Sequence, residues 1–288
     1  MTAFNEYDAL TRVLLRPARA AFAGPTRIAA EWRALNFTAP PGLDAADAQH
    51  AAFASLLERA GVRVETLDEP GLSLDSIYVR DASIVAPAGV VLCRMGKAAR
   101  QDEPAAQRRL FEALGVPIAG TIEPPGAIEG GDVVWFDAQT VAVGRGYRTN
   151  DAGIAQFRAM LGRAIEVVIV PLPHYRGPAD VFHLMSIISP VARDLAVAYS
   201  PLMPVPFREW LVDRGLGFVE VPDTEFDSMG ANVLAVGPRR VVMLAGNPVT
   251  QARLEAEGVE VWTYEGSEIS LKGGGGPTCL TRPLAREA

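Results

Sequence analysis

The chain has 288 residues, 49% of them hydrophobic, with a formal net charge of -7 and a pI near 5.1. This length and composition suit a large folded core and exclude a disordered or fibrous chain. A shortage of Lys and Arg argues against a nucleic-acid partner, and no apolar run reaches the roughly 20 residues of a membrane span.

The first predicted strand covers residues 11–16, and the first clear amphipathic helix covers residues 44–59. Between them, residues 18–26 are rich in small side chains and could form either a lid or an idle surface loop. After the helix, Gly61 introduces a short β-branched run. The same order of helix, small turn and short strand recurs along the chain, which indicates a repeated unit.

Five copies of this turn can be recognised. They are centred on Gly61, Gly115, Ile165, Gly215 and Gly258, at steps of 54, 50, 50 and 43 residues. Two short strands are expected before each later helix, and they cover residues 83–85 and 90–94, 133–136 and 140–144, 184–189 and 195–199, and 231–236 and 240–244.

The unit is therefore strand, strand, helix, strand, with residues 104–114 as the second clear helix. One such unit cannot bury both of its faces, so five are expected to close into a ring with helices outside. Residues 278–283 would then meet the first strand across the closure. We expect a single domain over residues 1–288; an open α/β sandwich is the alternative.

Polar residues at the strand ends of different units are candidates for a site, because these ends converge on the ring axis. Residues 75–81 alternate polar and apolar side chains, as in a half-buried strand with one solvated face. Residues 124–132 form a turn-rich entry to a strand, with Glu129 and Asp132 flanking two glycines. These acids could equally be solvated groups of a tight turn.

Two further candidates lie towards the end of the chain. His183 precedes an apolar run and is either a proton carrier or a satisfied structural histidine. Cys279 follows four consecutive glycines at 273–276, which suit a close backbone approach to a ligand. The other cysteine, Cys93, lies in an apolar run and is expected to pack as a small hydrophobic residue. A Cys, a His and several acids make a complete set for covalent attack on a cationic carbon.

Two cysteines are too few for a disulfide framework, so a reduced, cytoplasmic setting is predicted. Residues 1–8 lack the basic start and apolar run of a secretory signal. The sequence leaves open whether the chain acts alone or as a homodimer.

At this point the sequence resembles the pentein superfamily of guanidino-group-modifying enzymes, most of all the dimethylarginine dimethylaminohydrolases, with the arginine deiminases close behind. The resemblance spans essentially the whole chain. The segments that carry it are Val79-Arg80-Asp81, Glu129-Gly130-Gly131-Asp132, Gly146-Tyr147-Arg148-Thr149-Asn150, His183-Leu184 and Thr278-Cys279. It implies a fivefold α/β propeller, which agrees with the repeat count.

The resemblance also implies roles for residues of this chain. Cys279 would be the nucleophile and His183 the general acid and base, while Glu129 and Asp81 would bind the guanidinium of a small-molecule substrate. Further roles fall to Asp75 and Tyr78, which would line the pocket, and to Arg148 and Arg94, which would bind the substrate's α-carboxylate. No metal or organic cofactor is implied.

Two departures bear on the substrate. Deiminases and amidinotransferases usually carry an Asp two positions after the catalytic His, where this chain has Met185. The apolar side chain favours an alkylated guanidine such as N-methylated arginine, giving citrulline and an amine. The segment 275–277 is more like that of a deiminase, so free arginine remains a candidate. The sequence is also compatible with an amidinotransferase and with a non-catalytic propeller that serves as a binding module.

Overall fold

Five three-stranded sheets form the framework of the described chain. The structure, a computed structural model, describes residues 4–180 and 182–287. In every sheet the middle strand is antiparallel to one neighbour and parallel to the other, and a helix leads into the parallel strand. This is the predicted strand, strand, helix, strand unit, and with the solved structures compared below it confirms the five-bladed α/β propeller.

Four of the units are continuous in sequence. They comprise β3 (Ser83–Ala86), β4 (Gly89–Leu92), α4 (Glu103–Ala113) and β5 (Ile118–Thr121); β6 (Val133–Asp137), β7 (Thr140–Arg145), α5 (Asp151–Leu161) and β8 (Glu166–Pro171); β9 (Ile188–Ala192), β10 (Leu195–Ala198), α6 (Val205–Asp213) and β11 (Gly217–Glu220); and β12 (Val233–Gly237), β13 (Arg240–Leu244), α8 (Pro248–Ala256) and β14 (Glu260–Tyr264).

The fifth unit joins the two ends of the chain. Its middle strand is β1 (Ala9–Leu15), which pairs in parallel with β2 (Arg63–Thr66) after α3 (Leu43–Arg59). The antiparallel neighbour of β1 is the last strand, β15 (Arg282–Glu287). The first strand therefore meets the C-terminal segment as predicted, although that strand begins at Arg282 rather than at residue 278.

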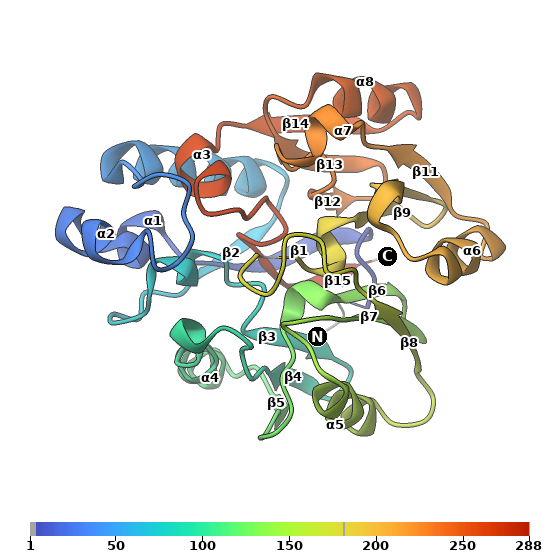
Figure 1. The fold of residues 1–288 in the computed structure, drawn as a ribbon, viewed down its shortest axis with the longest axis horizontal. Helices are drawn as coiled ribbons and strands as arrows, with labels where there is room; N and C mark the ends of the chain where they lie inside the picture. Colours follow the sequence, from blue (N-terminus) through green and yellow to red (C-terminus); the bar gives the residue numbers. More distant parts are fainter. Residues whose placement is uncertain (1–3, 181, 288) are drawn as a thin grey trace.

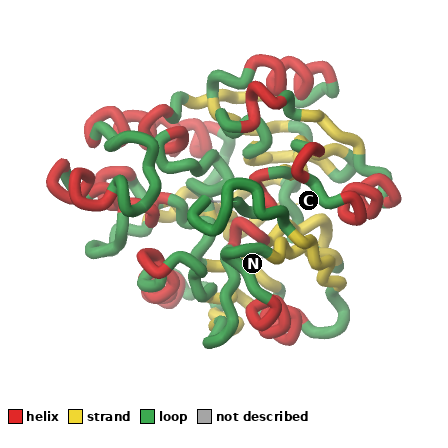
Figure 2. Tube along the Cα trace, in the orientation of Figure 1, coloured by secondary structure: helices red, strands yellow, loops and turns green. Residues whose placement is uncertain are grey.

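Helices lie towards the rim and strands lie further in (Figures 1 and 2). Short apolar runs such as β4 and β7 are buried along most of their length, because helices cover one side and neighbouring sheets the other. The remaining short helices are α1 (Ala18–Phe22), α2 (Pro25–Glu31), α7 (Asp223–Phe226), the 3-10 turns η1 (Leu74–Ile77), η2 (Ala98–Arg100), η3 (Gly130–Asp132), η4 (Leu184–Ser186) and η5 (Ser200–Leu202), and the π-helix η6 (Ser267–Leu271).

The glycines of the repeated turn have a physical reason to be there. Gly61, Gly115, Gly215 and Gly258 all adopt a positive φ, between 66° and 87°, where the chain leaves a helix for the parallel strand. Only glycine enters this region without a steric penalty. In the third unit the equivalent residue is Gly162, with φ of 78°, so the weaker copy placed at Ile165 was displaced by three residues.

Three local predictions are wrong. Residues 75–81 form no half-buried strand: η1 and the turn after it are buried throughout. The strand predicted from residue 184 begins at Ile188, because residues 184–186 form η4 instead. The segment 18–26 is not a surface loop, because it is largely helical and Ala18, Ala21 and Phe22 of α1 are fully buried.

Candidate active site

Each of the five units contributes one polar side chain just before its first strand. These side chains are Asp81 before β3, Glu129 before β6, His183 before β9, Asn232 before β12 and Cys279 before β15. They follow one another at intervals of about 50 residues, the repeat length of the fold. The propeller therefore brings together residues that are far apart in the chain.

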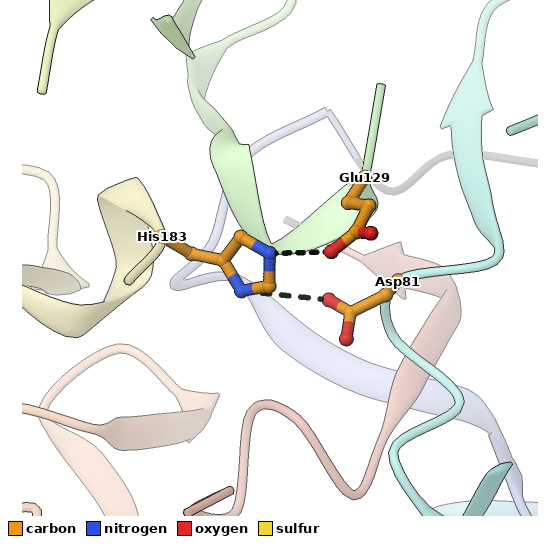
Figure 3. A group of neighbouring side chains, drawn as sticks. All are labelled: Asp81, Glu129 and His183. Atoms are coloured by element: carbon orange, nitrogen blue, oxygen red, sulfur yellow. Dashed lines mark hydrogen bonds and ion pairs between the residues drawn. The ribbon is translucent and has the colours of Figure 1, made fainter. Parts of the chain in front are cut away.

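His183 lies between two carboxylates (Figure 3). Its Nε2 is 2.8 Å from a carboxylate oxygen of Glu129, and its Nδ1 is 3.8 Å from Oδ1 of Asp81. All three side chains are buried, with at most 3% of any of them exposed. Such a pair of carboxylates holds an imidazole in one orientation and favours its protonated form.

Gly131, the second glycine after Glu129, leaves room for His183 to lie beside Asp81. A Cβ on Gly131 would lie 2.6 Å from Nδ1 of His183 and 2.8 Å from Oδ1 of Asp81. The amide of Gly131 also donates a hydrogen bond to Asp81, at 3.1 Å. The Glu-Gly-Gly-Asp segment is thus a close-packed part of the site rather than a solvated turn.

Further hydrogen bonds fix the three groups. Oε1 of Glu129 accepts from the amides of Gly96 and Lys97, at 2.9 and 3.3 Å. Asp132 accepts from the hydroxyl of Thr149 at 2.6 Å and from the amide of Leu184 at 3.0 Å, which ties the Glu129 segment to the His183 turn.

Arg100 neutralises Asp81 from the other side. Its Nη1 is 2.6 Å from Asp81, while Glu103 receives two further guanidinium bonds at 2.8 Å each. Nη2 also donates to the carbonyl oxygen of Tyr78, at 2.8 Å. Arg100 is therefore fully engaged by the protein and is a positioning residue for Asp81.

The pKa of His183 is raised to about 9. Burial alone would lower this pKa, but the negative charges of Asp81 and Asp132 and the hydrogen bond to Glu129 outweigh it. The pKa of Glu129 is lowered in turn, because its bond to His183 outweighs burial. Near neutral pH the site therefore holds an imidazolium that can donate a proton.

Cys279 is half-buried, and its sulfur lies 3.5 Å from Nδ2 of Asn232. Burial and the negative charge of Asp81 raise the pKa of its thiol to about 11, although hydrogen bonds from Thr278 and Asn232 act the other way. The thiol is therefore neutral in the unliganded site. A cation bound beside Asp81 would remove one cause of this shift and favour the thiolate.

Two cavities meet at these residues, and His183, Gly274 and Cys279 line both. The aromatic cavity, of about 140 Å³, is also lined by Tyr175, Phe182, Phe226 and Met185. The charged cavity, of about 20 Å³, is lined by Asp75, Tyr78, Asp81, Lys97, Arg100 and Arg148. The second volume holds about one water molecule, so it fits only a small group tightly.

Six of the eight predicted site residues line one or both cavities, namely Cys279, His183, Asp81, Asp75, Tyr78 and Arg148. Glu129 lines neither cavity and joins the site through its 2.8 Å contact with His183. Arg94 does not line either cavity; its Nη1 donates to the carbonyl oxygen of Gly126 at 3.2 Å. Among the described residues, Asp81, Glu129 and His183 could together offer a metal ion three ligand atoms, all within 4.8 Å of one another.

Sequence reasoning missed Asn232, Lys97 and Arg100. Asn232 had a usable signal, because it occupies the same place before a first strand as the four predicted residues. Lys97 and Arg100 had a weaker one, since they follow β4 in a segment that only the folded chain brings against Asp75 and Asp81.

None of the helices in the described part of the chain combines the length and apolar character that crossing a membrane requires.

Known proteins match most of this chain. The family model described as "N,N dimethylarginine dimethylhydrolase, eukaryotic" matches residues 42–286. The N(G),N(G)-dimethylarginine dimethylaminohydrolase of Streptomyces coelicolor is 33% identical over 208 residues, which cover 72% of this chain and 73% of that protein. The arginine deiminase of Rhodococcus erythropolis is 30% identical over 256 residues, covering 73% of this chain and 60% of that longer protein.

A solved structure shows the same fold. The dimethylarginine dimethylaminohydrolase of Pseudomonas aeruginosa, in complex with citrulline, superposes with a TM-score of 0.75 at 23% identity. The match covers 95% of this chain and 98% of that one.

Proposed function

Because this chain belongs to the dimethylarginine dimethylaminohydrolase family, we propose that it hydrolyses a guanidinium C–N bond through a covalent intermediate on Cys279. The products are a ureido compound and an amine or ammonia. The observation that carries the proposal is the meeting of an imidazolium, its two carboxylates and a cysteine at one small cavity.

Substrate binding prepares the nucleophile. The guanidinium cation pairs with Asp81, which offsets the negative charge that raises the pKa of the thiol. Cys279 then loses its proton to solvent and attacks the central guanidinium carbon as a thiolate. Holding the planar cation in the narrow charged cavity contributes orientation as well as charge.

His183 completes the reaction in two steps. Its imidazolium donates a proton to the departing amine, which breaks the C–N bond and leaves a thiouronium on Cys279. The neutral imidazole then takes a proton from water as the water attacks the thiouronium carbon. Collapse of that adduct breaks the C–S bond: its hydroxyl proton passes to the departing sulfur, which restores the Cys279 thiol, and the ureido product leaves with a new C=O bond. Glu129 and Asp81 stabilise the imidazolium before it gives up its proton and again after it has regained one.

Arginine and its N-methylated forms are the first candidates, giving citrulline in each case. Met185 lines the aromatic cavity, where an apolar side chain suits methyl groups better than a carboxylate would. A deiminase or dihydrolase would use the same intermediate, and an amidinotransferase would resolve it with an amine instead of water. Product analysis with added glycine or ornithine separates hydrolysis from transfer.

The proposal is tested with paired variants. Cys279→Ser should abolish turnover while substrate still binds, and His183→Ala should accumulate a covalent adduct visible as a mass shift on the intact protein. Cys93→Ala is the matched control, because Cys93 is buried in the core and lines neither cavity. Wild-type turnover in Cys279→Ser, or loss of turnover in Cys93→Ala alone, would refute the assignment.

A further inference from the structure

Lys97 places an ammonium group in the wall of the charged cavity. The chain has only two lysines, Lys97 and Lys272, against 25 arginines. Nζ of Lys97 is 2.5 Å from Oδ2 of Asp75 and donates to the carbonyl oxygen of Leu35 at 2.9 Å. The lysine side chain is 14% exposed and that of Asp75 only 6%.

A buried carboxylate and a carbonyl oxygen at these distances form a binding site for an ammonium ion. The protein fills this site with its own side chain. A substrate that brought a second ammonium to the same place would have to displace Lys97 or lie against it, and like charges in a poorly solvated site repel strongly.

The cavity also offers groups for an anion. An ammonium has three N–H donors, and Asp75 and Leu35 accept two of those of Lys97. Arg148 lies 3.7 Å from Glu129, which is too long for a hydrogen bond, so its planar guanidinium keeps donors for a carboxylate. Arg100, in contrast, is engaged by Asp81, Glu103 and Tyr78.

We propose that Lys97 determines substrate choice by occupying the ammonium site of Asp75 and Leu35, so that the preferred substrate is a guanidino acid carrying a carboxylate but no amino group beside it. This inference rests on the proposed hydrolysis, and in place of arginine and its N-methylated forms it puts analogues that lack the amino group. The carboxylate binds Lys97 and Arg148 in the charged cavity, and the guanidinium binds Asp81 where this cavity meets the aromatic cavity at His183 and Cys279.

The test compares three compounds that differ by one group each: L-arginine, 5-guanidinopentanoate, which lacks the amino group, and agmatine, which lacks the carboxylate. The wild-type protein should turn over 5-guanidinopentanoate with a kcat/KM at least about tenfold above that of arginine, and agmatine should be the poorest. A wild-type preference for arginine would overturn the proposal.

Lys97→Met removes the ammonium and keeps the length of the side chain. Asp75 is then free for the amino group of arginine, so the preference should fall by at least about tenfold. Lys97→Arg keeps a cation and should keep the preference. Lys272→Met is the matched control, since Lys272 also joins a carboxylate and a carbonyl oxygen, at 2.6 Å to Glu268 and 3.1 Å to Pro40, outside the cavity. An unchanged preference in Lys97→Met would contradict the role of this residue.

A binding measurement keeps the two proposals apart. Titration calorimetry of Cys279→Ser with 5-guanidinopentanoate and with arginine compares their affinities without turnover. Absence of any ureido product from the wild-type protein would refute the proposed hydrolysis alone. Tighter binding of arginine than of 5-guanidinopentanoate would refute the role of Lys97 alone.

Discussion

Replacement of Glu129 by glutamine should make His183 a much weaker base. The two groups are 2.8 Å apart and almost inaccessible to solvent. Removing one charge of a buried ion pair costs about 3–5 kcal/mol. The glutamine amide keeps a hydrogen bond, so we take the lower end, which corresponds to about two pKa units. The pKa of His183, raised to about 9 in the native protein, should then fall to about 7.

Proton NMR can follow this change directly, because the chain has only three histidines. Burial lowers the pKa of His50 to about 4, so its signal should not move near neutral pH. His183→Gln assigns the remaining signals. The basic limb of the kcat profile should move to lower pH together with the NMR midpoint, since the same imidazolium donates the proton.

A buried glutamate elsewhere supplies the control for that experiment. Glu225 accepts hydrogen bonds from Val249 and Thr250 rather than from His183, and Glu225→Gln should leave the titration of His183 unchanged. A midpoint that stays near its native value in Glu129→Gln would show that the ion pair does not set the protonation of His183.

Two further predictions follow from the same geometry. The pKa of His183 is about 9 in the folded protein and 6.5 in the unfolded chain. Protonation of His183 therefore stabilises the folded state fully below pH 6.5, and this stabilisation is lost as the pH rises through about 9. Urea unfolding should therefore show a loss of about 3 kcal/mol across this window that is absent from His183→Gln; an equal loss in that variant would refute the assignment. Gly131→Ala should lower kcat/KM at least about 100-fold, because its methyl group would displace His183 or Asp81. Gly24→Ala, where a Cβ meets nothing within 4 Å, should be neutral in the same assay, and wild-type activity in Gly131→Ala would contradict the close packing.

The architecture could be predicted because the sequence repeats one strand, strand, helix, strand unit five times. The turn from helix to strand needs a glycine with a positive φ in all five units, so the same residue type recurs at nearly constant steps. The failures are local. Residues 75–81 alternate like a strand, but the folded chain buries their polar side chains as well as their apolar ones, and Arg100 donates hydrogen bonds to Asp81 and to the carbonyl oxygen of Tyr78.

Site residues were harder to predict when their role depends on contact with another side chain of the protein. Rarity in the sequence singles out Cys279 and His183, and a short motif singles out Glu129. The resemblance to a known family pointed to all three. Lys97 carries no such pattern: its meaning depends on the 2.5 Å approach to Asp75, which only the folded chain reveals. Asn232, in contrast, would have followed from the repeat alone.

The pairing of β15 with β1 has a consequence for how the protein is made. During translation the ribosome delivers β1 first, and its antiparallel partner β15 emerges after every other described strand. Cys279 is three residues before β15, so the nucleophile reaches its position in the same late event that completes this sheet. The nascent chain therefore remains catalytically silent, with one strand edge of β1 unpaired, until synthesis has passed residue 287.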